Sequence, residues 1–85
     1  MNGSLDWQDA KYKETYEQEL LGLERRRERE KDFTIADLKA LLSHLYKMDG
    51  NDWVGRGLLQ DTIMAATLAA HESFLERWKA EEEGK

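Results

Sequence analysis

The sequence predicts an all-α protein of three helices: a long N-terminal arm helix and an antiparallel helical hairpin that dimerises into a helical bundle. Proline is absent from the 85 residues, and apolar residues recur at steps of three and four rather than two. Residues 1–32 hold 9 apolar and 16 charged residues, whereas residues 33–80 hold 25 and 11. We therefore expect one small domain over residues 1–85, with a polar arm (1–32), an apolar hairpin (33–80) and an acidic tail (81–85).

The arm is predicted to be a helix over residues 5–31 with one narrow apolar stripe. Leu5, Tyr12, Tyr16 and Leu23 project within about 40° of one another on a helical wheel, with Leu20 at the margin. The following residues, 24–32, are all charged, and opposite charges recur three positions apart. Such pairs stabilise a solvated helix by a few tenths of a kcal/mol each. We therefore expect a water-exposed helix end rather than a nucleic-acid patch, since local acids nearly cancel the arginines.

The second helix is predicted over residues 34–49, and its start carries the strongest local signal. Thr34 followed by Asp37 resembles a capping box with a short acid. Phe33 stands just before the cap and is expected to contact Leu38 as a hydrophobic staple. The expected apolar face of this helix consists of Ile35, Leu38, Leu41, Leu42, Leu45 and Met48.

The third helix is predicted over residues 53–82, capped by Asp52. The preceding helix should end at Asp49, with Gly50 in the left-handed conformation. The third helix carries two apolar stripes about 100–120° apart. One stripe is Leu59, Ile63, Ala66, Ala70 and Phe74, and the other is Met64, Leu68, His71, Leu75 and Trp78. A helix that is apolar on two faces must be covered on both.

The second helix can cover one of these stripes, which leaves the other for the arm or for a second subunit. We expect a symmetric homodimer through the third helix, whose alanines permit close approach of the backbones. The predicted dimer interface is the second stripe: Met64, Leu68, His71, Leu75 and Trp78.

The turn between the last two helices, residues 49–57, is a candidate contact for an unknown protein partner. It contains three of the six glycines and matches neither a calcium-binding loop nor a complete dinucleotide-binding motif. Trp53 and Arg56 are residue types that are enriched in interface hot spots. These two residues are the predicted partner-binding site, and packing of Trp53 over the end of the hairpin is the structural alternative.

The carboxylates suggest one enzymatic alternative. Glu14 and Glu17 have the Glu-x-x-Glu spacing of a magnesium-binding helix, and Asp49 and Asp52 are the nearest second pair. This arrangement would suit an all-helical magnesium-dependent nucleotide pyrophosphohydrolase-like enzyme. The second pair falls in a predicted turn and lacks its glutamate, so we assign no catalytic, cofactor-binding or metal-binding residue and expect no cofactor.

Composition restricts the remaining function classes. The net charge is −5 at pH 7 and cysteine is absent, so neither nucleic-acid binding nor thiol chemistry is expected. No apolar run reaches about 18 residues, so no membrane association is expected and the default location is the cytoplasm. The favoured hypothesis is a non-enzymatic protein–protein interaction or assembly module.

Overall fold

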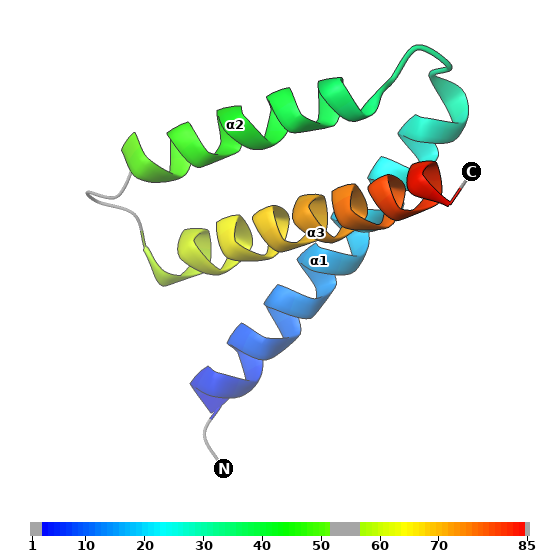
Figure 1. Ribbon diagram of the computed structural model, residues 1–85. Helices are drawn as coiled ribbons and strands as arrows, with labels where there is room; N and C mark the ends of the chain where they lie inside the picture. Colours follow the sequence, from blue (N-terminus) through cyan, green and yellow to red (C-terminus); the bar gives the residue numbers. More distant parts are fainter. Residues whose placement is uncertain (1–2, 52–56, 85) are drawn as a thin grey trace.

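The computed structural model describes residues 3–51 and 57–84 and confirms the all-helical prediction in these ranges. Three helices follow one another: α1 (Gly3–Arg29), α2 (Ile35–Asn51) and α3 (Leu58–Glu83). α3 is central, because it packs against both other helices, whereas the described parts of α1 and α2 have no backbone contact with each other. Figure 1 shows α2 and α3 as an antiparallel hairpin, with α1 crossing α3 and running in the same general direction. The polar arm, rather than a second subunit, therefore covers one side of α3.

The start of α2 forms as predicted. The Thr34 hydroxyl oxygen accepts a hydrogen bond from the Asp37 backbone N–H at 3.2 Å, and the Asp37 carboxylate accepts one from the Thr34 N–H at 3.0 Å. Each side chain thereby satisfies a backbone donor that the first helical turn leaves free. Phe33 and Leu38 belong to the same buried cluster, as expected for the staple.

Two predicted helix ends are wrong. Gly50 lies inside α2, which continues to Asn51; glycine permits the left-handed conformation but does not require it. α3 begins at Leu58 rather than at residue 53. The residue before it, Gly57, has an extended backbone and no side chain that could cap the helix. Glycine is a poor helix former, and Gly57 directly before Leu58 agrees with this later start. The predicted cap, Asp52, lies outside the described residues.

The main hydrophobic core lies at one end of the molecule, where the end of α1 and the start of α2 meet the last turns of α3. Its buried members are Leu23, Phe33, Leu38, Phe74 and Trp78, with Leu20, Ile35, Leu41 and Leu75 packed around them. The Trp78 ring lies 5.7 Å from that of Phe33 and 5.8 Å from that of Phe74 between ring centres. Tilted and edge-on pairs at such distances add to the stabilisation from burial alone.

Away from this core, the buried positions on α1 and α3 are small or polar. They are Thr15 on α1, and Thr62, Ala66, Ala70 and His71 on α3. The Thr62 hydroxyl donates to the Leu58 carbonyl at 2.9 Å, and His71 Nδ1 lies 2.8 Å from the Thr67 carbonyl. Thr62 and His71 therefore each have a hydrogen-bond partner within α3.

The arm stripe is right in part. Leu23 is buried, whereas Tyr12 is 39% exposed and Thr15, which the stripe omitted, is buried. Tyr16 is half-buried, and its hydroxyl donates to the Ser73 hydroxyl of α3 at 2.9 Å. The side chain of Leu5, the first residue of the predicted stripe, lies outside the part of the chain whose side chains the structure describes.

Leu38→Ala tests whether the core at this end holds the fold together. Leu38 is fully buried, so its truncation should lower the free energy of unfolding by about 2–5 kcal/mol. Leu21→Ala is the matched control, because Leu21 is 46% exposed on α1 and its truncation should change stability by less than about 0.5 kcal/mol. Urea unfolding followed by circular dichroism measures both, and equal losses would contradict this assignment of the core.

Candidate protein-interaction surface

Residues 24–32 are mostly exposed, as expected, and two of them, Glu24 and Arg27, also form ion pairs with α3. Arg27 pairs with Glu81 of α3 at 2.9 Å, and its guanidinium lies 4.3 Å from the centre of the Trp78 ring. Arg77 of α3 reaches back to Glu24 at 2.9 Å. The charges thus form bridges between helices in addition to pairs along one helix, and the guanidinium groups cover aromatic rings of the core.

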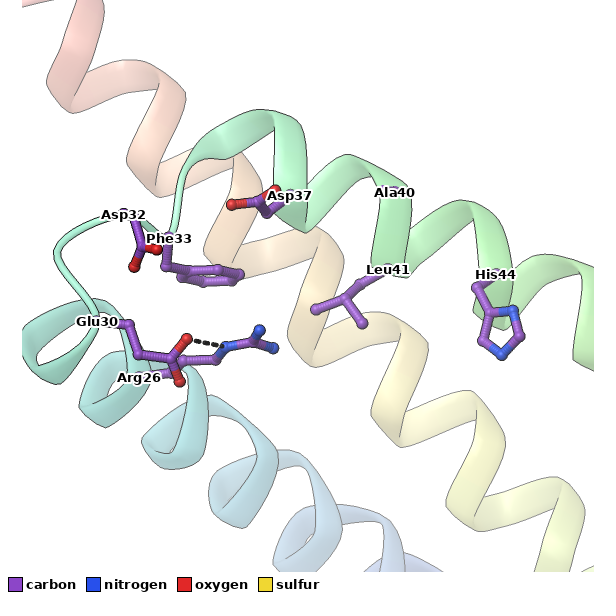
Figure 2. A pocket seen from close by; sticks show the side chains of 8 residues that line it. All are labelled: Arg26, Glu30, Asp32, Phe33, Asp37, Ala40, Leu41 and His44. Atoms are coloured by element: carbon purple, nitrogen blue, oxygen red, sulfur yellow. Dashed lines mark hydrogen bonds and ion pairs between the residues drawn. The ribbon is translucent and has the colours of Figure 1, made fainter.

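A hollow of about 420 Å³ lies where the end of α1 faces α2. Figure 2 shows the Arg26 side chain beneath the Phe33 ring and paired with Glu30, while Leu41 and His44 extend from α2. The guanidinium lies 4.3 Å from the centre of that ring. Asp37 on the rim is engaged in the cap of α2. The polar groups of this hollow mainly serve the fold, so we do not assign it a ligand.

A larger hollow, of about 580 Å³, lies between α2 and α3 on another side of the hairpin. It is lined by Lys39, Leu42, Ser43, Tyr46, Glu72, Leu75 and Glu76. Leu42 is buried and Leu75 is half-buried, whereas the residues around them are exposed. An apolar floor with a charged rim is the arrangement found at protein interfaces. We call this hollow and the outer sides of α2 and α3 around it the hairpin face.

Tyr46 is the large aromatic residue of the hairpin face and is 49% exposed. Its hydroxyl donates a hydrogen bond to the Glu72 carboxylate, which links α2 to α3. This hydrogen bond, with a smaller effect of lost hydration and of the Glu72 charge, raises the pKa of Tyr46 above 10.0. The ring is therefore neutral at physiological pH and held in place by a charge-assisted bond.

Further large apolar side chains are exposed at the open end of the hairpin, where α2 ends and α3 begins. Met48 is 44% exposed, Leu58 54% and Leu59 48%. Figure 1 shows that the end of α2 and the start of α3 lie at the same end of the hairpin. Exposed apolar side chains that gather in one region are typical of a contact surface.

The structure divides the residues predicted for the dimer interface. His71 and Trp78 are each only 6% exposed within a single chain. Met64, Leu68 and Leu75 are half-buried and retain some accessible surface. Trp53 and Arg56, the predicted partner-binding residues, lie outside the described residues. The hairpin face itself was missed, although the spacing of Lys39 and Tyr46 on one side of α2 was available as a signal.

The acidic residues considered for magnesium show no convergence in the part of the chain that the structure describes. Glu14 and Glu17 are exposed on α1, Asp49 lies near the end of α2, and Asp52 lies outside the described residues. Within those limits, no three side chains of His, Asp or Glu lie close enough to hold a metal ion. The same residues include no helix that is both long enough and apolar enough to cross a bilayer.

Comparison of this chain with protein-family models, with curated proteins and with solved structures found no match. The functional argument therefore depends on the geometry of the hairpin face.

The Tyr46–Glu72 bond is open to a direct test by titration. In the native chain Tyr46 should lose its proton above pH 10.0, because ionisation breaks the hydrogen bond and places two negative charges together. The hydrogen bond stabilises the folded chain fully below the pKa of an unfolded tyrosine. This stabilisation is lost as the pH rises through the higher pKa of Tyr46 in the folded chain. The titration is followed by absorbance near 295 nm, and the signal of Tyr46→Phe is subtracted to isolate that of Tyr46. The midpoint should be lower in Glu72→Gln than in the native chain. Glu76→Gln is the control for the change of charge. Equal titration midpoints in Glu72→Gln and Glu76→Gln would contradict the hydrogen bond.

Proposed function

We propose that this chain is a non-enzymatic protein-interaction or assembly module that binds a helical partner on its hairpin face. The observation that carries the proposal is the apolar hollow of about 580 Å³ between α2 and α3, with charged residues at its rim. Grooves between two helices accept the apolar side of a third helix, with anchors at intervals of three and four residues. The predicted homodimer belongs to this proposal, since Met64, Leu68 and Leu75 keep accessible surface on α3.

The chemistry of the hairpin face supports binding rather than catalysis. Its charged groups, Lys39, Glu72 and Glu76, are exposed, and Glu72 already accepts the bond from Tyr46. Catalytic groups generally combine a sheltered position with a pKa tuned to the reaction. The hairpin face instead combines an aromatic anchor with apolar side chains and a solvated rim, which suits recognition of another surface.

Site-specific photo-crosslinking tests which face of the molecule binds. A photoreactive phenylalanine analogue at position 46 should form a defined crosslinked product in producing cells, whereas the same group at position 21 should not. The two positions are matched, because Tyr46 is 49% exposed and Leu21 is 46% exposed on a different helix. The purified partner should lose affinity for Tyr46→Ala and bind Leu21→Ala normally. Equal crosslinking at both positions, or equal affinity of both variants, would contradict the proposed face.

The enzymatic alternative makes a different prediction for ligand binding. A ligand that binds only the native state raises the melting temperature by mass action. For an interaction module, magnesium together with nucleoside triphosphates should leave the melting temperature of the chain unchanged. A saturable increase that disappears in Glu14→Gln would instead support the magnesium-dependent nucleotide pyrophosphohydrolase.

A further inference from the structure

The charges of the hairpin face are divided between its two helices. Lys39 is on α2, while Glu72 and Glu76 are on α3. Lys39 forms no ion pair with the residues that the structure describes. Glu76 is 75% exposed and its one ion pair there is with Lys79, at 3.9 Å. The face therefore presents a lysine without an ion pair among the described residues on its α2 side, and two exposed carboxylates on its α3 side.

This division makes the hairpin face complementary to itself. From it we infer that the occupant is a second copy of this chain, related by a two-fold axis that lies in the interface parallel to the helices. The inference rests on the proposed function and names the partner of the same face. The rotation keeps the direction of every helix and exchanges their positions, so that α2 of each copy faces α3 of the other. The four helices then alternate in direction, as in antiparallel bundles.

The same rotation brings unlike charges together twice. Lys39 and Glu76 line the same hollow from its two opposite helices. The rotation places α2 of each copy against α3 of the other, so Lys39 of each copy comes close to Glu76 of the other. Both contacts are identical by symmetry, so each charge change acts on the interface twice. Glu72 lies beside this pair and stays bound to Tyr46 of its own chain.

The apolar residues fit the same arrangement. Leu42 and Leu75 form the floor of the hollow, and the rotation places Leu42 of one copy opposite Leu75 of the other. The 17 residues of α2 span about 25 Å, and two adjacent helices are about 20 Å wide. These dimensions give a projected area of about 500 Å² per copy. The accessible surface that each copy buries is larger, because ridges of side chains interdigitate, and a standard stable interface buries about 800 Å² per partner.

Charge exchange in the full chain tests this dimer. Sedimentation equilibrium across the micromolar range should show a dimer of the native protein. Lys39→Glu and Glu76→Lys should each weaken association by at least about tenfold, because both symmetric contacts then place like charges together. An equimolar mixture of these two variants should restore the dimer, since both of its cross-contacts again join Glu with Lys. Lys13→Glu on α1 is the matched control, because it makes the same charge change on an exposed residue outside the hairpin face.

The outcomes separate this inference from the proposed function. A native protein that stays monomeric, variants that associate like the native chain, or a mixture that fails to recover would each overturn the dimer. If the chain is monomeric and position 46 crosslinks a different protein, the face is a binding site for that protein and the second copy is excluded. Circular dichroism and thermal unfolding of each variant establish that a loss of association is not a loss of fold.

Discussion

Burial of Trp78 and Phe74 at the meeting point of the three helices is the constraint on which the rest of the structure depends. Their rings contact Phe33, which stands at the turn before α2, and Leu23 and Leu38 complete the cluster. At this one site α3 thus contacts both α1 and α2. In so small a chain little other large apolar surface is buried, and the guanidinium groups over the rings extend this core with methylene and planar surface.

The position of this core explains why the opposite end of the hairpin has exposed apolar residues. Towards the start of α3 the buried positions are Thr62, Ala66 and Ala70, which permit close approach of α1 but contribute little apolar area. Large residues at that end, Met48, Leu58 and Leu59, therefore stay exposed. The hairpin face begins beside the core and leads towards this thinner end, so binding there would extend the apolar packing rather than repeat it.

Local chemistry in the sequence predicted the elements well where a single residue pair decides the outcome. Thr34 and Asp37 form their capping box with each other's backbone N–H groups, and both partners lie within one turn. The end of α2 was not predictable in this way, because Gly50 is compatible with both conformations and the surrounding helix decides. The inter-helix pairs of Arg27 with Glu81 and of Arg77 with Glu24 were beyond prediction as well, since many opposite charges offered equally good local partners.

The candidate surface was harder to predict because helical periodicity identifies apolar positions without identifying what covers them. The two stripes of α3 showed correctly that this helix needs cover on two sides, and both sides receive some of it from the same chain. His71 and Trp78 are buried in this way, so a helical projection alone assigns too many residues to a second subunit. What remains for a partner is decided by the crossing of α1 over α3, which leaves the outer sides of α2 and α3 accessible. Lys39 and Glu76 lie on different helices there, so only the folded hairpin brings the two charges to one face.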